Sequence, residues 1–589
     1  MILKVLVAKI NLGKIGIFMK LISKHELVKA ARGKIPADTL FKNARLINVF
    51  SGDIEETSIA VHRGIVVGYG NYRAKKTVDL KNRYVAPGLV EGHIHTESSM
   101  LEMGEFVKAV VPFGTTTIVC DPHEIANVLG LEGITYMLQS AKYQPMDIYF
   151  TLPSTVPASN METSGARLSA VDLMPYFSQK WVVGLGEVMN VPGVLENNSE
   201  VFDKLKIAAD KTIEGHAPGL SGKDLYAYIT SGIRSDHESF GKAEAKEKLS
   251  AGMTIMIREG SVAKNLETLA PLVNEKNYSD FCLVSDDRNP IDLVEHGHLD
   301  YTIRKAIRCG IPPITAVRMA TINPARHFGL KHIGAVAPGY LADFIVMDNL
   351  KQFNVKNVYK TGIEVGRNGK VVGVKFPPRV PLRSSINVKW LMPASFKLPA
   401  KTSKANVIEI VKNQLLTKKS VLPIKTSAGF AVSDVKNDIL KITVVERHRA
   451  SGNIAQGFVK GFGLKRGALA SSFAHDSHNI ICVGCDDESI FNAVLTIVKA
   501  GGGLCCWEPG KSEILPLPIG GLMSNKNLSF VYKKLKKLQS AAFSMGCKVR
   551  DPFMVLSFLA LPVIPELKIT DKGLVNVSKN KFENLFVRN

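Results

Sequence analysis

The feature that most constrains the fold is a unit repeated between residues 85 and 338, in which a short apolar run ends in a polar residue and a helix-like stretch follows. Eight such units occur, and their polar ends lie 21 to 33 residues apart. The ends are His95, Asp121, Ser154, Glu187, His216, His237, Glu259 and Asp286. Parallel strands that alternate with helices at this spacing predict an α/β protein with a TIM-like (β/α)8 barrel over residues 85–338.

The stretches on either side of the barrel have a different pattern. Residues 38–84 and 339–385 alternate apolar and polar positions between Gly and Asn turns, as in SIAVHRGIVVGYG and NVYKTGIEVGRNG. This pattern is typical of short strands. We predict that the two flanks form one composite β-sandwich, that residues 1–37 are an extension and lead-in, and that residues 400–589 form a C-terminal α+β domain.

Length and cysteine usage indicate the environment of the chain. With 589 residues, 46% of them hydrophobic, the chain can bury large cores without disulfides. Its eight cysteines are spaced irregularly, unlike the framework of a small secreted domain. No apolar run reaches the ~18 residues of a membrane span, so we expect a cytoplasmic protein away from membranes. Met19 is an alternative start, which would leave the first 18 residues without a structural role.

The net charge of +22 raises the question of nucleic acid as a partner. The lysines are scattered, and no zinc finger, homeodomain or RNP-like motif occurs. We therefore expect no nucleic-acid partner. A basic nucleic-acid-binding protein with an inactive barrel is the distant alternative, and it predicts salt-sensitive binding and no stoichiometric metal.

Residues with metal-binding side chains recur at the predicted strand ends. His93 and His95 are two apart on a strand, so both side chains point the same way and can hold one ion at the barrel mouth. An isolated pair of this kind is more often two ordinary polar residues. Here four further residues with metal-binding side chains follow at barrel spacing: Glu187, His216, His237 and Asp286. Imidazole and carboxylate ligands of this kind predict a divalent metal site.

The sequence resembles the adenine deaminase branch of the amidohydrolase superfamily, in order from about residue 38 to the C-terminus. The two-histidine motif identifies only the superfamily, whereas ESSM, DPHEIANV and SDHES are more specific. The matching segments are PGLVEGHIHTESSM (87–100), CDPHEIANV (120–128), GLGEVMN (184–190), EGHAPGLSG (214–222), SDHES (235–239), VSDDRNP (284–290), ATINPARHFGL (320–330), PGYLADFIV (338–346) and GFGLKRGALASSFAHDSHN (461–479).

The resemblance implies a centre of two divalent ions, with Mn²⁺ preferred and Fe²⁺ or Zn²⁺ possible. Glu187 would bridge the ions where many relatives use a modified lysine, and a carboxylate can do so directly. The remaining ligands would be His93, His95 and Asp286 on one ion and His216 and His237 on the other.

The activity that the resemblance implies is hydrolytic deamination of adenine to hypoxanthine and ammonia in purine salvage, with a water activated between the two ions. Asp286 is the candidate to carry a proton from that water to the ammonia. A second acid should protonate the ring nitrogen, and the sequence does not rank Glu97, Glu124 and Glu238 for this role. The alternative is a barrel amidohydrolase for another cyclic amidine or amide. We expect a homodimer.

Further polar side chains are expected near the strand ends. Four candidates to bind the purine or to orient ligands are Ser98, Ser99, Asp121 and His123. Alternatively, Asp121 and Pro122 start a turn or helix. Arg258 and Glu259, at the seventh strand, can pair with each other.

A last cluster lies in the C-terminal domain. His475, Asp476 and His478 can reach the barrel mouth or hold a separate ion, and the two histidines are candidates for substrate binding. Cys482 and Cys485 add a CxxC spacing, so a structural zinc is a further alternative. If this segment is a strand, however, the side chains of the histidines and cysteines need not point toward one site. The CxxC also lacks the preceding proline of the other zinc nucleobase deaminases, so deamination would use the barrel.

Overall fold

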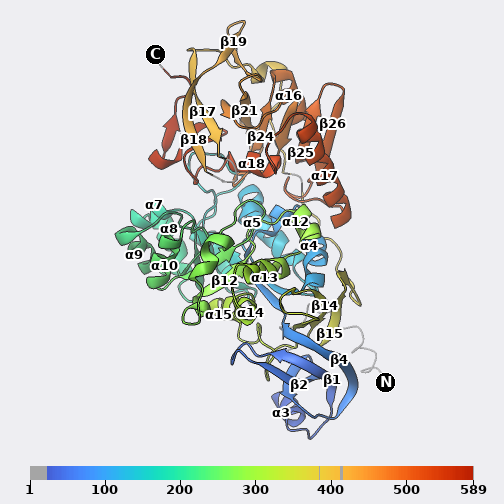
Figure 1. Ribbon diagram of the computed structural model, residues 1–589. Coiled ribbons are helices and arrows are strands. Elements are labelled where there is room, and N and C mark those ends of the chain that lie inside the picture. The colour runs from blue at the N-terminus through green and yellow to red at the C-terminus, as the bar shows by residue number, and fades with distance from the viewer. Residues whose placement is uncertain (1–22, 384, 412–415, 588–589) are drawn as a thin grey trace.

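A computed structural model describes residues 23–383, 385–411 and 416–587. The alternative start at Met19 lies outside these residues. Figure 1 shows three parts along one axis, with a β-sheet at one end, a barrel in the middle and an α+β domain at the other end. Within the described part of the chain, every helix is too short or too polar to cross a membrane.

Eight parallel strands form the barrel, as predicted. They are hydrogen-bonded in the order β5 to β9 and β10 to β12. The barrel closes through Asp286, whose N–H donates to the His93 carbonyl (3.0 Å), and through Arg234, whose N–H donates to the Ile213 carbonyl (3.1 Å). The strands are β5 (Leu89–Ile94), β6 (Thr115–Cys120), β7 (Asp147–Leu152), β8 (Val182–Val188), β9 (Thr212–Gly215), β10 (Ser235–Asp236), β11 (Thr254–Arg258) and β12 (Phe281–Val284).

Helices surround the strands. Strand β6, with the sequence TTTIVC, is buried at all six positions, as expected when helices cover a parallel sheet. Helix starts are defined by capping residues; Asn289, for example, accepts a hydrogen bond from the Asp292 N–H ahead of Pro290. The helices are α4 (Met103–Val110), α5 (His123–Ser140), α6 (Ala170–Phe177), α7 (Val191–Leu195), α8 (Ser199–Ile207), α9 (Gly222–Thr230), α10 (Lys242–Ser250), α11 (Leu266–Leu269), α12 (Pro290–Glu295), α13 (Leu299–Arg308), α14 (Pro313–Met319) and α15 (Ile322–His327).

Both flanks of the barrel join in one eight-stranded sheet of order β16-β15-β14-β13-β4-β1-β2-β3. The sheet curls, because its edge strand β3 returns to the other flank, where the Val66 N–H donates to the Tyr340 carbonyl (2.9 Å). Strands from both flanks therefore belong to one sheet. The elements are α3 (Lys24–Ala31), β1 (Ala37–Ile47), β2 (Ile54–His62), β3 (Ile65–Tyr69), β4 (Ala74–Pro87), β13 (Phe344–Met347), β14 (Val355–Lys360), β15 (Ile363–Arg367) and β16 (Lys370–Val371).

The C-terminal part is built on a second eight-stranded sheet, β18-β17-β22-β21-β24-β23-β25-β26, with α16 packed on β23, β24 and β25. The loop between β23 and β24 carries residues 475–478. The elements are β17 (Lys404–Ile410), β18 (Thr417–Pro423), β19 (Lys425–Ser427), β20 (Phe430–Val432), β21 (Ile439–Val445), β22 (Ile454–Lys460), β23 (Ala468–Ser471), β24 (Ile480–Gly484), α16 (Asp487–Lys499), β25 (Gly503–Glu508), β26 (Lys511–Pro516), α17 (Leu528–Ser544), α18 (Pro552–Phe558), β27 (Leu567–Thr570), β28 (Gly573–Asn576) and β29 (Lys581–Glu583).

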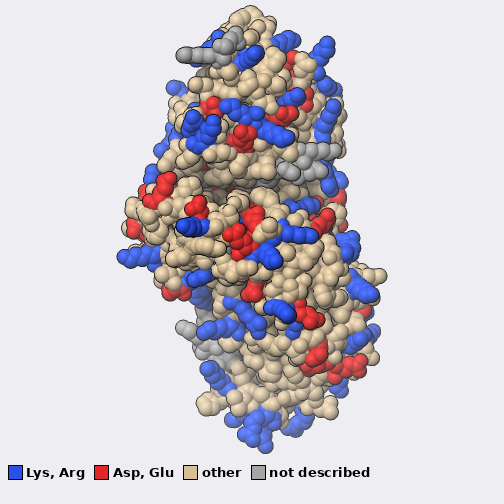
Figure 2. Space-filling model, turned by 60° about the vertical axis from the view of Figure 1, so that its left-hand side comes forward, with Lys and Arg blue, Asp and Glu red and all other residues tan. Residues whose placement is uncertain are grey.

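Positively charged side chains are dispersed on one face of the molecule. On the face shown in Figure 2, lysines and arginines lie over all three parts of the molecule with acidic residues among them. This face therefore carries no continuous basic stripe of the kind that tracks a nucleic-acid backbone.

Candidate metal centre

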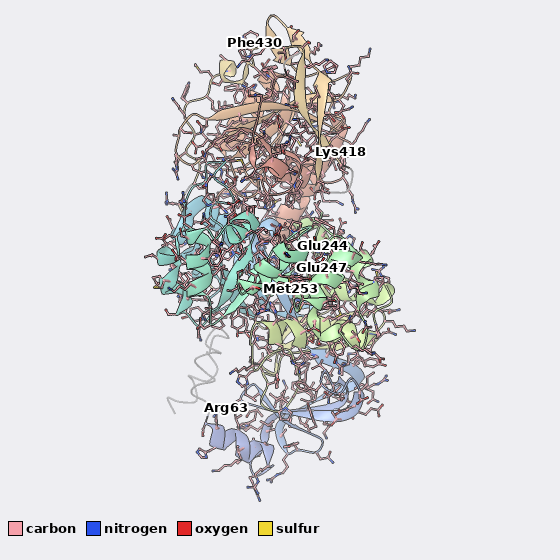
Figure 3. All side chains as sticks on the ribbon, turned by 90° about the vertical axis from the view of Figure 1, so that its left-hand side faces the viewer. Arg63, Glu244, Glu247, Met253, Lys418 and Phe430 are labelled. Atoms are coloured by element: carbon pink, nitrogen blue, oxygen red, sulfur yellow. The ribbon has the colours of Figure 1, made fainter. Side chains whose placement is uncertain are left out.

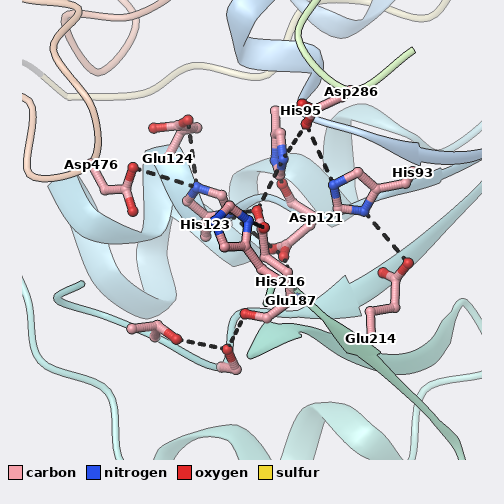
Figure 4. A network of polar contacts seen from close by, with 12 residues as sticks. His93, His95, Asp121, His123, Glu124, Glu187, Glu214, His216, Asp286 and Asp476 are labelled. Carbon is pink, nitrogen blue, oxygen red and sulfur yellow. Dashed lines mark hydrogen bonds and ion pairs between the residues drawn. The ribbon is translucent and has the colours of Figure 1, made fainter. Parts of the chain in front are cut away.

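Six side chains from five different strand ends meet at the barrel mouth, and Figure 4 labels five of them, all but His237. Each is at most 8% exposed. On one side, the His95 Nε2 lies 3.2 Å from Asp286 Oδ1, and the His93 Nε2 lies 3.5 Å from the same oxygen. The six are His93, His95, Glu187, His216, His237 and Asp286, which are the predicted metal ligands.

Glu187 lies between two groups of histidines. Its Oε1 is 3.2 Å from the His95 Nε2. Its Oε2 is 2.7 Å from the His216 Nδ1 and 3.2 Å from the His237 Nε2. Because each carboxylate oxygen faces its own set of imidazoles, Glu187 has the arrangement of a bridging ligand.

These residues fit a divalent metal centre. The His216 Nδ1 and the His237 Nε2 are only 3.3 Å apart, and both point at the same carboxylate oxygen. Both ring nitrogens of His93 are buried without a hydrogen bond. Buried polar atoms in proteins are nearly always partnered, and imidazole with carboxylate is the donor set of Zn²⁺, Fe²⁺ and Mn²⁺ sites.

Neighbouring charges keep the carboxylates of the centre ionised. Burial alone would raise the pKa of Glu187, but His237 and His216 hold it well below its usual range. Burial also raises the pKa of Asp286, but Arg258 together with His93, His95 and His237 outweighs that effect and holds it well below the usual range. Ionised carboxylates are the form that binds cations.

Arg258 does not pair with Glu259, and that alternative is wrong. The Arg258 Nη1 lies 2.5 Å from both Glu238 Oε2 and Asp286 Oδ2. Glu259 instead pairs with Lys305, at 2.9 Å. The guanidinium can span two carboxylates because the side chains of neighbouring strands converge at the mouth.

The loops after β9 and β10, which carry His216 and His237, are held together by one buried lysine. Lys248, on α10, donates to the Ala217 carbonyl (2.6 Å) and to Asp236 Oδ2 (3.0 Å). The Asp236 Oδ1 accepts from the Ala217 N–H (2.9 Å). Glu244, labelled on the same helix in Figure 3, also pairs with Lys248 (2.7 Å). The network fixes the spacing of the loops that carry two candidate metal ligands.

Two of the four predicted substrate or orienting residues touch the centre. The Asp121 carboxylate accepts from the Glu187 N–H (3.2 Å), and the His123 Nδ1 lies 3.6 Å from Glu187 Oε1. The Ser98 hydroxyl donates to the Asp287 carboxylate. Ser99 is used within its own turn, where its hydroxyl donates to the Thr96 carbonyl (2.5 Å).

The C-terminal histidines reach the barrel. The His475 Nδ1 lies 2.6 Å from Glu124 Oε1, and the His478 Nε2 contacts Glu124 Oε2. Cys482 does not join them, since it is buried in the apolar cluster under α16 with its Sγ near the Ile490 carbonyl. The alternative of a zinc held by the histidines and the cysteines together is therefore wrong.

Two acidic residues near the centre are not among those that the sequence predicted. The Glu214 Oε1 lies 3.5 Å from the His93 Nδ1, the second nitrogen of that ring. Glu214 is two positions before His216, and strand alternation could have placed it on the inner side. Asp287, which accepts from Ser98, directly follows Asp286 and carries no signal of its own.

The barrel and the candidate metal ligands at its mouth are those of a metal-dependent hydrolase. Residues 84–372 match the profile of the Amidohydrolase family, and residues 414–581 match that of the Adenine deaminase C-terminal domain. An adenine deaminase of Desulfatibacillum aliphaticivorans is 47% identical over 565 residues, covering 95% of this chain and 99% of that relative. The chain belongs to the adenine deaminase family.

Two further similarities were found. An adenine deaminase of Methanothrix thermoacetophila is 47% identical over 566 residues, covering 96% of this chain and 99% of the relative. Among solved structures, the β-aspartyl dipeptidase of Fervidobacterium islandicum AW-1 is 17% identical, with a TM-score of 0.44 over 58% of this chain and 100% of that one.

Proposed function

We propose that this protein hydrolyses adenine to hypoxanthine and ammonia. The observation that carries the proposal is Glu187, whose two oxygens face separate sets of imidazoles in a barrel. Relatives named adenine deaminase that are 47% identical over nearly the whole chain support adenine as the substrate.

The ligand geometry supports two ions. His93, His95 and Asp286 would hold one, His216 and His237 the other, and Glu187 both. We propose Mn²⁺, with Fe²⁺ or Zn²⁺ as alternatives, because two carboxylates add oxygen donors to the imidazoles. When bound, such a pair lowers the pKa of water and stabilises negative charge that develops on the substrate.

Asp286 is the proposed proton carrier. Its Oδ1 faces His93 and His95, whereas its Oδ2 is turned to Arg258. Arg258 keeps the carboxylate ionised, so Oδ2 can accept the proton of the attacking water and pass it to the departing ammonia.

Glu97 is the proposed second acid. Burial raises the pKa of Glu97 to about 7, where a carboxylic acid can give up a proton near neutral pH. The other two candidates are engaged by other side chains, Glu124 by two histidines and Glu238 by Arg258. Glu97 would therefore hold the proton that the purine ring nitrogen receives.

The substrate is tested by steady-state ammonia release from adenine, adenosine, guanine and cytosine, using metal-loaded enzyme. We expect turnover of adenine alone. Release of ammonia from another ring, with none from adenine, would overturn adenine as the substrate. The protein would then be an amidohydrolase for that other ring.

The proposal also covers the pathway, the cellular compartment and the oligomeric state. Hypoxanthine and ammonia are products suited to purine salvage. All eight cysteines are free, as expected in a reducing, cytoplasmic compartment. We expect a homodimer in gel filtration and no nucleic-acid binding. The residues that stay predictions for purine contact are Ser98, Ser99, Asp121, His123, His475 and His478.

A further inference from the structure

A second group of metal-binding side chains lies beside the centre, between the barrel and the C-terminal domain. His123 and Glu124 begin helix α5 of the barrel, and His475 and Asp476 lie in the loop between β23 and β24. All four side chains are at most 5% exposed. Figure 4 shows Glu124 and Asp476 on the same side of His123, away from Glu187.

One atom from each residue lies 4.0 Å or less from a carboxylate oxygen or ring nitrogen of another member of the group. The His123 Nε2 lies 3.5 Å from Glu124 Oε1 and 4.0 Å from Asp476 Oδ1. The His475 Nδ1 lies 2.6 Å from Glu124 Oε1 and 3.7 Å from Asp476 Oδ1. Two ligands of a tetrahedral ion with bonds of about 2.0–2.1 Å are about 3.3 Å apart. The four contacts span 2.6 to 4.0 Å and so lie on both sides of this spacing.

The hydrogen bonding of the group is incomplete. The Glu124 Oε1 is buried and accepts no hydrogen bond, although the His475 Nδ1 is 2.6 Å away, so the contact lacks hydrogen-bond alignment. The Asp476 Oδ2, on the same carboxylate as Oδ1, is also buried without a hydrogen bond. Such atoms are rare in proteins and call for a partner such as an ion.

Neighbouring residues orient two of the four ligands. The His478 Nδ1 accepts from the Ala474 N–H (3.0 Å), so its Nε2 carries the hydrogen that is donated to Glu124 Oε2. This leaves Oε1 for the cluster. The His123 Nδ1 makes no hydrogen bond but lies 3.6 Å from an Asp121 oxygen, so a carboxylate faces the side of the ring away from Nε2. Imidazoles that bind metals are typically oriented by a carboxylate in this way.

The charges of the group also favour a bound cation. Glu124 and Asp476 are two carboxylates buried at 0% and 2% exposure. Buried charges are costly unless they are paired or coordinate a metal. A divalent cation bound by these two carboxylates and two neutral imidazoles would leave the site without net charge.

We propose that His123, Glu124, His475 and Asp476 hold a further divalent cation of the Zn²⁺, Fe²⁺ and Mn²⁺ class, separate from the pair at Glu187. Two nitrogen and two oxygen donors suit these borderline ions. The cation joins the first turn of α5 to the loop of the C-terminal domain, and thereby fixes that loop over the barrel mouth. The proposal does not depend on adenine being the substrate.

The test is a count of bound metal. Wild type, Asp476→Asn and His475→Gln are stripped with a chelator, reloaded with Zn²⁺ and measured by elemental analysis. We expect three ions per chain in the wild type and two in each variant. The control is Glu162→Gln, which removes another buried carboxyl near this loop and should keep three. Reloading with Co²⁺ should give a visible absorption component that both variants lack.

Two ions in the wild type and two in both variants would overturn the proposal. An unchanged metal count together with a raised KM for adenine would do the same, and would assign the cluster to purine binding. Circular dichroism of each variant identifies misfolding. Two different substitutions keep the test decisive, because only loss of one ion in a folded variant supports the site.

Discussion

At the scale of single residues, Glu187 is the side chain that both halves of the centre share. Glu187→Gln keeps the volume but removes the charge that faces three imidazoles. We expect the metal content to fall and deamination to drop by at least the ~10–100-fold typical of lost metal-site support. Elemental analysis of protein purified without chelators measures the first effect. Glu196→Gln, at an exposed position, is the control, and full metal retention in Glu187→Gln would contradict the bridging role.

Glu97 leads to a prediction about pH. Its pKa of about 7, raised by burial, means that the proton is present below pH 7 and lost above it. An acid must hold its proton to donate it, so kcat should fall as the pH rises through about 7. Glu97→Gln should lower kcat by about 10²–10⁴ and remove this alkaline limb. Metal content should stay unchanged. A retained limb in the variant would assign the ionisation to another group.

Residues on regular strands were the predictable part of the centre. His93 and His95 follow from strand alternation, and the eight strand ends follow from the repeated spacing. The contact of Glu124 with His478 joins positions 354 residues apart. It depends on how the C-terminal domain docks, which no local pattern encodes. The Arg258 pairing was missed for the same reason, because its partners come from other strands.

At the scale of elements, α10 supports two strand ends through Lys248, which is fully buried. Lys248→Met would leave the Asp236 carboxylate buried without its cation, which typically costs about 3–5 kcal/mol. We expect that loss in urea unfolding, together with weaker metal binding in chelator competition, since the loops of His216 and His237 lose their link.

The matched control on α10 is Lys246→Met, at an exposed position of the same helix. Its unfolding free energy should stay within about 0.5 kcal/mol of the wild type. Equal losses in the two variants would mean that helix propensity, and not the buried network, is responsible.

At the scale of the whole molecule, the barrel and the C-terminal domain share one apolar core. The same cluster of buried residues includes Phe106 and Ile125 from the barrel and Phe473, Leu522 and Phe558 from the C-terminal domain. Polar contacts also cross the boundary. The Ser524 N–H donates to the Met100 carbonyl (2.9 Å), and Asn289 donates to Asp551 (2.9 Å).

A continuous core makes separate melting unfavourable, because either part alone would expose apolar surface at about 25 cal/mol per Å². We therefore predict a single calorimetric transition for the barrel and the C-terminal domain. Chelation should lower its midpoint, since ions that bind only the folded state stabilise it. Phe558→Ala, which removes the ring stacked on His475 (4.4 Å between centroids), should lower the same midpoint without splitting the transition. Two resolved transitions in the wild type, with only one sensitive to chelation, would show that the domains fold independently and that the loop over the mouth is not held by the barrel.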